Sequence, residues 1–88
     1  MNEYIDTPDG TNGVVTFTPD PLYKTDGEEV RIDGRIVGRI RRMSSGTHRG
    51  EATISGLAVA DGATRSDAIR LVLEQAREDL RNEAREKA

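Results

Sequence analysis

The chain has 88 residues, a formal net charge of −3 and no cysteine. This length allows one domain at most, and the lack of cysteine excludes disulfides, zinc–thiolate sites and thiol catalysis. Hydrophobic residues make up 34% of the chain and aromatic residues only 3%, so the core is small and we expect a homodimer or a partner to stabilise it. The N-terminal residues are too polar for a signal peptide and no apolar run could cross a membrane, so a cytoplasmic location is expected.

The net charge hides a strong segregation of charge along the chain. Residues 1–30 contain one lysine and seven carboxylates, a net charge of −6, whereas residues 31–50 contain six arginines and one aspartate, a net charge of +5. Residues 51–63 add −2, and residues 64–88 are neutral overall. An acidic N-terminal segment therefore precedes a basic central segment that it can tune or mask.

Residues 1–28 are predicted to be an acidic and mostly irregular arm. This segment contains all three prolines of the chain and several turn-forming residue pairs. The β-branched and aromatic residues at 14–18 predict one short strand, which Pro19 and Pro21 end or confine to an edge. Residues 29–88 are predicted to form the folded domain.

Residues 28–43 alternate between apolar and charged side chains, which predicts a β-hairpin. The Asp-Gly pair near its centre is typical of a tight type I′ turn. A two-residue loop would pair Ile32 with Arg35 and mix charged and apolar side chains on one face. We favour a three-residue loop or a bulge, which pairs Val30 with Gly38 and keeps the two kinds of side chain on separate faces.

A third strand is predicted over residues 49–55, followed by a bulge at Gly56. Residues 65–86 are predicted to be a helix, because Thr64 and Asp67 fit a capping box. The apolar face of this helix should pack on the sheet, with pairing to a second copy as the alternative. The residues of that face recur at helical spacing: Ile69, Val72, Leu73, Ala76 and Leu80. The expected fold is α+β, an antiparallel three- to four-stranded sheet packed against one long C-terminal helix.

Arginines of the hairpin form the main candidate binding surface. The alternation places Arg31, Arg39 and Arg41 on one face of the sheet, with Arg35 at the turn and Arg49 on the next strand. Guanidinium groups on such a face can bind the phosphates of DNA through paired hydrogen bonds. The alternative is a solvated outer face that the acidic residues of the N-terminal arm partly neutralise.

Residues 61–70, with the sequence Asp-Gly-Ala-Thr-Arg-Ser-Asp-Ala-Ile-Arg, resemble the start of the second helix in ribbon-helix-helix DNA-binding proteins. The resemblance covers residues 54–76 and implies that Arg65 and the amides at the start of the helix bind a DNA phosphate. It also implies a helix, rather than a strand, over residues 47–60.

A second resemblance covers residues 29–80. The run Val-Arg-Ile-Asp-Gly-Arg that begins at residue 30, followed by a third strand and a helix, resembles small ββ(β)α modules of phage and plasmid genomes. The layout is also similar to AP2-type and integrase arm-type DNA-binding domains. This similarity implies that a three-stranded sheet lies in the major groove, with Arg31, Arg39 and Arg41 facing the DNA.

The sequence contains no recognisable set of catalytic or metal-binding residues. His48 is the only histidine, phosphate-loop and dinucleotide motifs are absent, and no nucleophile can be paired with a base. We therefore expect no enzyme activity, no cofactor, no metal and no small-molecule substrate. The leading hypothesis is a regulatory DNA-binding protein. The alternative is a module of phage type that engages or inhibits a host protein through its sheet or long helix.

Overall fold

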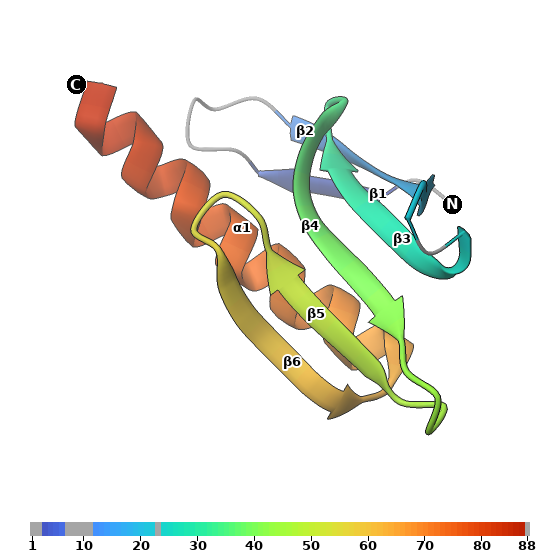
Figure 1. The fold of residues 1–88 in the computed structure, drawn as a ribbon. Coiled ribbons are helices and arrows are strands. Elements are labelled where there is room, and N and C mark those ends of the chain that lie inside the picture. The colour runs from blue at the N-terminus through green and yellow to red at the C-terminus, as the bar shows by residue number, and fades with distance from the viewer. Residues whose placement is uncertain (1–2, 7–11, 23, 88) are drawn as a thin grey trace.

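The computed structural model describes residues 3–6, 12–22 and 24–87. These residues form one antiparallel sheet, with its strands in the order β1-β2-β3-β4-β5-β6, and one C-terminal helix (Figure 1). The elements are β1 (Glu3–Asp6), β2 (Asn12–Asp20), β3 (Lys24–Ile32), β4 (Arg35–Arg42), β5 (His48–Ala52), β6 (Leu57–Ala63) and α1 (Arg65–Lys87). The α+β class is confirmed, but the expected count of three to four strands is wrong because the described residues form six.

The additional strands come mainly from the segment that was predicted to be an irregular arm. The predicted strand at 14–18 lies within β2, which is longer and pairs with both β1 and β3. β2 brings Val15 into the core, where it is fully buried, and this burial favours sheet over coil despite the prolines. Pro19 is tolerated because the β2–β3 register shifts between Pro19 and Asp20, near the end of the strand. The predicted domain boundary between residues 28 and 29 falls inside β3, and Pro8 lies outside the described residues.

The β3–β4 hairpin combines the two alternatives that the sequence left open. Its turn has two residues, because Ile32 pairs with Arg35, so the three-residue loop is wrong. Asp33 and Gly34 have φ angles of 51° and 84°, as a type I′ turn requires. A bulge then restores the favoured register, and Val30 pairs with Gly38 as predicted. This bulge is the physical reason that Val37 is fully buried, whereas Ile36, which the alternating pattern places in the core, is only partly buried.

Residues 48–63 form two strands joined by a short turn, instead of one strand with a bulge. The turn is closed by a backbone hydrogen bond in which the Gly56 amide donates to the Ala52 carbonyl at 2.8 Å. β5 and β6 then pair antiparallel, with irregular register near Gly50. The helix that the ribbon-helix-helix resemblance implies over residues 47–60 is therefore not formed, since strands occupy most of this segment.

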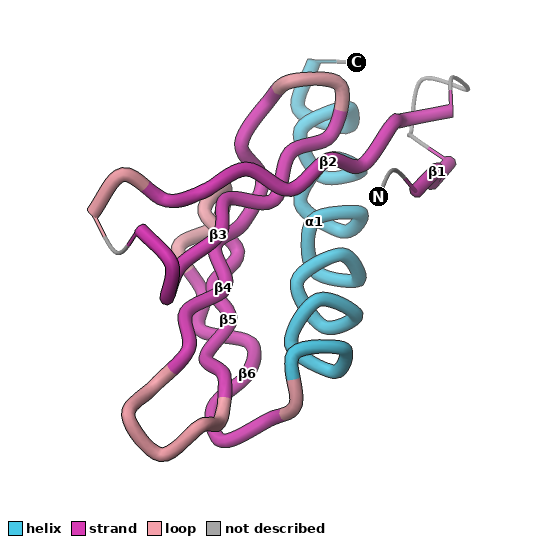
Figure 2. The backbone as a smooth tube through the Cα atoms, turned by 90° about the vertical axis from the view of Figure 1, so that its right-hand side faces the viewer, coloured by secondary structure: helices cyan, strands magenta, loops and turns pink. Residues whose placement is uncertain are grey.

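Helix α1 begins and packs as the sequence predicts. The Thr64 Oγ1 atom accepts a hydrogen bond from the Asp67 amide at 3.1 Å, which caps the first turn. The helix lies along one side of the sheet (Figure 2) and contacts β4, β5 and β6. Close approach is possible because two glycines face it: a Cβ on Gly38 would collide with Val72, and a Cβ on Gly50 would lie 2.9 Å from Val72 Cγ2.

The core lies between this helix and the sheet. The predicted apolar helix face supplies Val72, Leu73 and Ala76 as buried residues, with Ile69 and Leu80 packed at the border. Ala68 was not among the residues predicted for this face, although it is fully buried. On the sheet side the buried hydrophobic residues are Val15, Val30, Ile32, Val37, Ile40, Ala52 and Ala60. Within the described part of the chain, no helix combines the length and apolar character needed to cross a membrane.

Candidate nucleic-acid interface

Strands β4 and β5 carry arginines on the face of the sheet opposite to α1. Gly38 and Ile40 face the helix, so the alternating positions Arg39 and Arg41 face the other way. Arg39 pairs across the strands with Glu51, and Arg41 lies directly opposite Arg49. Three of the predicted arginines are therefore neighbours on one exposed surface, as the alternation in the sequence indicates.

These arginines surround a shallow hollow of about 260 Å³, which we call the arginine hollow. The β2–β3 connection completes its rim. Its lining residues are Asp20, Leu22, Arg39, Arg41, Arg49 and Glu51. The hollow therefore combines three guanidinium groups with acidic side chains and one apolar side chain.

Two ion pairs at the arginine hollow are long, and they differ in their carboxylates, since Asp20 is buried whereas Asp61 is exposed. Arg39 Nε lies 3.8 Å from Asp20 Oδ2, and Arg49 Nη2 lies 3.4 Å from Asp61 Oδ2. The arginine side chains are 46% and 50% exposed. An exposed pair such as Arg49–Asp61 contributes about 0–1 kcal/mol. An incoming anion can therefore replace Asp61 at little cost in stability, whereas taking Arg39 from Asp20 leaves a buried carboxylate without its counter-charge.

Arg31 lies on the same side of the sheet but is held by neighbouring residues. Its guanidinium donates to Thr18 Oγ1 at 3.2 Å, to the Gly34 carbonyl at 2.9 Å and to Glu29 Oε1 at 3.2 Å. Glu29 is only 7% exposed, so Arg31 compensates a buried carboxylate. Arg31 therefore has a clear structural role, and the three-arginine face of the prediction becomes Arg39, Arg41 and Arg49.

The other two predicted arginines lie elsewhere. Arg35 forms a bidentate pair with Glu83 of α1, with both N–O distances at 2.7 Å. This hydrogen-bonded pair raises the pKa of Arg35, although partial desolvation acts in the opposite direction. Arg65 pairs with Glu28 at 2.7 Å, and its guanidinium stacks 5.5 Å from the centre of the Phe17 ring. Both side chains connect elements of the fold rather than join the arginine hollow.

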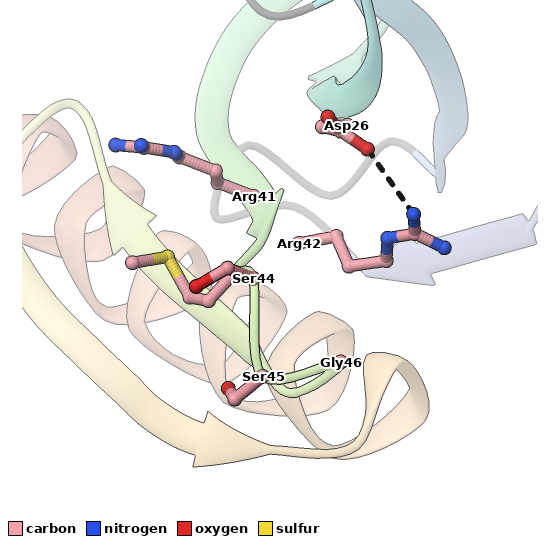
Figure 3. A pocket seen from close by; sticks show the side chains of 7 residues that line it. Asp26, Arg41, Arg42, Ser44, Ser45 and Gly46 are labelled. Carbon is pink, nitrogen blue, oxygen red and sulfur yellow. Dashed lines mark ion pairs between the residues drawn. The ribbon is translucent and has the colours of Figure 1, made fainter.

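Arg42 was not among the predicted site residues, although it follows Arg41 directly. Figure 3 shows the two side chains pointing in different directions, and Arg42 Nη2 lies 3.5 Å from Asp26 Oδ1. Both arginines line a second hollow, of about 560 Å³, under the β4–β5 loop. Arg41 lines both hollows and connects them. The two consecutive arginines at positions 41 and 42 are the feature of the sequence from which this second basic position could have been predicted.

The acidic N-terminal segment neutralises part of the basic segment, as the alternative interpretation of its charge predicted. Four carboxylates from β2 and β3 make ion pairs with arginines. These pairs are Asp20–Arg39, Asp26–Arg42, Glu28–Arg65 and Glu29–Arg31. The separation of charge along the sequence therefore becomes a mixed surface in the fold.

Outside the arginine hollow, the buried polar groups of the described residues include Asp79 and the Nδ1 atom of His48. Asp79 is 5% exposed and accepts a hydrogen bond from Ser55 Oγ at 2.8 Å, which holds the β5–β6 turn to α1, and a second one from Gln75 Nε2 of the same helix at 3.0 Å. The Nδ1 atom of His48 is buried and has no hydrogen-bond partner among the described residues. In the same part of the chain, no three histidine or acidic side chains are grouped as a metal ion would require.

Comparisons with known proteins place the chain in no family. No family model matches it, no curated protein is similar to it, and no solved structure matches its fold. The function therefore has to be inferred from the residues and geometry of this chain.

Proposed function

We propose that the protein is a non-enzymatic, cytoplasmic DNA-binding protein that contacts the phosphate backbone through the arginine hollow. The observation that carries this proposal is the direct cross-strand pairing of Arg41 with Arg49, with Arg39 two residues away on the same face. Like charges placed opposite each other on a sheet repel, and the exposed pair of Arg49 with Asp61 offsets this repulsion only in part. A bound phosphate would relieve that repulsion.

The arrangement suits a phosphate ligand in geometry as well as in charge. Each guanidinium presents a planar fork that can donate two hydrogen bonds to one phosphate. The three arginines lie on paired strands rather than on loops, so their backbone is already ordered before binding. We propose that this sheet face lies in the major groove, as in the AP2-type and integrase arm-type domains that the sequence resembles in layout.

The acidic rim limits the strength of this binding. Arg39 and Arg49 must exchange their carboxylate partners Asp20 and Asp61 for phosphates, and Glu51 stays beside Arg39. We expect moderate affinity with a steep dependence on salt. If all three arginines neutralise phosphates, log K should fall against log salt with a slope of about −2.7, or about 40-fold between 50 and 200 mM salt.

The proposal is tested by reversing charge at the hollow and, as a control, on the helix. One variant carries Arg39→Glu, Arg41→Glu and Arg49→Glu, and its binding to a fluorescent duplex is measured by anisotropy across a salt series. The control reverses three exposed arginines of α1, so both variants have the same net charge. The control substitutions are Arg70→Glu, Arg77→Glu and Arg81→Glu.

We expect the hollow variant to lose salt-dependent binding, while the helix variant retains the slope of the unmodified protein. Circular dichroism confirms that both variants are folded. Absence of salt-sensitive binding by the unmodified protein would overturn the proposal. Equal losses in the two variants would also overturn it, because they would indicate a response to net charge alone.

A second candidate function is favoured by the free edge of the sheet. β6 is the last strand in the order, so one of its edges has no neighbouring strand within the described sheet. Leu57 at the start of β6 is 49% exposed. An extended segment of a host protein, or β6 of a second copy, could add to this edge by strand pairing. Because the apolar face of α1 is occupied by the sheet, we place any protein partner at this edge rather than on the helix.

Light scattering tests the homodimer, since a monomer has a mass of 9.7 kDa.

A further inference from the structure

Leu22 is an apolar side chain on the rim of the arginine hollow. It is 81% exposed, far more than Leu57, the other exposed large hydrophobic side chain in the described part of the chain, at 49%. It shares the hollow with Arg39, Arg41 and Arg49. An isolated exposed leucine is common on protein surfaces, but this one lies inside a cluster of guanidinium groups.

The position of Leu22 is fixed by the same residue that contacts the arginines. Asp20 is only 3% exposed, and its Oδ1 atom accepts a hydrogen bond from the Leu22 amide at 2.9 Å. Its Oδ2 atom lies 3.8 Å from Arg39 Nε. Pro21, between the two, has a backbone φ restricted by its ring. The backbone of Leu22 is therefore held at a defined place relative to Arg39.

We propose that Leu22 contacts the C5-methyl group of thymine in the major groove while the arginines hold the adjacent phosphates. This inference rests on the proposed DNA-binding function and names the base that the site would favour. The phosphates and the other groups along the major-groove edges are polar, whereas thymine exposes a methyl group there. Burying an exposed leucine is favourable against an apolar surface, and the thymine methyl is the most apolar group that the base edges present in the major groove.

The proposal separates the two tasks of the site. Arginine contacts to phosphates supply affinity that is independent of sequence, and the leucine contact supplies a preference for one base. A duplex in which deoxyuridine replaces every thymidine keeps all phosphates and hydrogen-bonding edges but lacks the methyl groups. Such a duplex should therefore bind more weakly, by the contribution of one buried methyl.

The experiment is a double-mutant cycle between protein and DNA. The unmodified protein and Leu22→Ala are each titrated with a thymidine duplex and with the matched deoxyuridine duplex at one salt concentration. Leu57→Ala is the control, since it truncates an exposed leucine of β6 outside the arginine hollow. We expect the unmodified protein and L57A to bind the deoxyuridine duplex about four-fold more weakly, and L22A to bind both duplexes equally.

The outcomes distinguish this inference from the proposed function. Salt-dependent binding without any preference between the two duplexes would overturn the leucine contact and leave the phosphate-binding face standing. Equal discrimination by L22A and the unmodified protein would also overturn it, because the preference would then arise from the DNA itself. Unchanged affinity of L22A for the thymidine duplex would overturn it as well, because the leucine would then contribute nothing to binding. Absence of any salt-sensitive binding would overturn both proposals.

Discussion

Replacing Gly38 with alanine tests how closely the sheet and α1 approach each other. A Cβ at this position would collide with Val72 Cγ1 and would lie 2.9 Å from the carbonyl oxygen of Glu51. Val72 is fully buried, so its side chain has no free space into which it can move. We expect G38A to lower the free energy of unfolding by about 2–3 kcal/mol, the upper part of the range for an overpacked core. Gly50→Ala places its Cβ 2.9 Å from Val72 Cγ2 and should cost less, about 1–2 kcal/mol.

Urea denaturation followed by far-ultraviolet circular dichroism measures these differences, and a double variant isolates the contact. Val72→Ala alone removes two buried methyl groups and should cost about 2 kcal/mol. In the G38A background the same truncation also removes the clash. The free energy of unfolding of the double variant should therefore be about 1–2 kcal/mol higher than the value obtained by adding the losses of the two single variants. Additive effects would refute the close approach, and so would a G38A variant as stable as the unmodified protein.

Three further predictions concern single contacts. Asp20→Asn keeps an acceptor for the Leu22 amide but removes the charge beside Arg39, so the affinity of this variant for DNA should rise. Anisotropy titration against the unmodified protein checks this. Unchanged affinity would show that Asp20 does not compete with phosphate. Thr64→Ala removes the cap of α1 and should cost about 1 kcal/mol of stability in urea denaturation, whereas no loss would show that the cap contributes little. Arg35→Met should cost only about 0.5–1 kcal/mol, because the pair with Glu83 is partly exposed. Since the pKa of Arg35 is raised in the folded state, the arginine's contribution is complete below its unfolded pKa and is lost only as pH rises through its folded pKa, in strong alkali. The difference from the unmodified protein should therefore stay constant from about pH 6 to about pH 10, and a decline across that interval would contradict the assignment.

The helix and the hairpin could be predicted from local signals, whereas the N-terminal strands could not. Thr64 and the apolar spacing of α1 are sufficient to place the helix, because capping and periodicity act within a few residues. The pairing of β2 with β3 instead depends on burying Val15, a contact between segments that are separated in sequence. Prolines and glycines around β2 are local signals for coil, and tertiary burial overrides them. The bulge at Val37 also depends on the neighbouring strand.

The candidate site could likewise be predicted only where local geometry determines it. Alternation along β4 places Arg39 and Arg41 on one face, and this follows from the geometry of a strand. The carboxylates that pair with the arginines come mostly from other elements of the fold, and no local pattern in the sequence predicts which carboxylate pairs with which arginine. Arg35 therefore could not be assigned to Glu83, nor Arg31 to the buried Glu29. The position of Leu22 on the rim depends in turn on the path of the β2–β3 connection.

The most direct test of the DNA-binding face is a nuclear magnetic resonance titration of the isotopically labelled protein with a short duplex at low salt. It follows backbone amides together with the arginine Nε–Hε signals. We predict the largest shifts at Arg39, Arg41 and Arg49 and at the Leu22 amide, with little change along the exposed side of α1, and reversal of these shifts when salt is added. Shifts confined to β6 would place the partner at the free edge of the sheet instead. Shifts confined to α1, or no shifts at any salt concentration, would contradict the account.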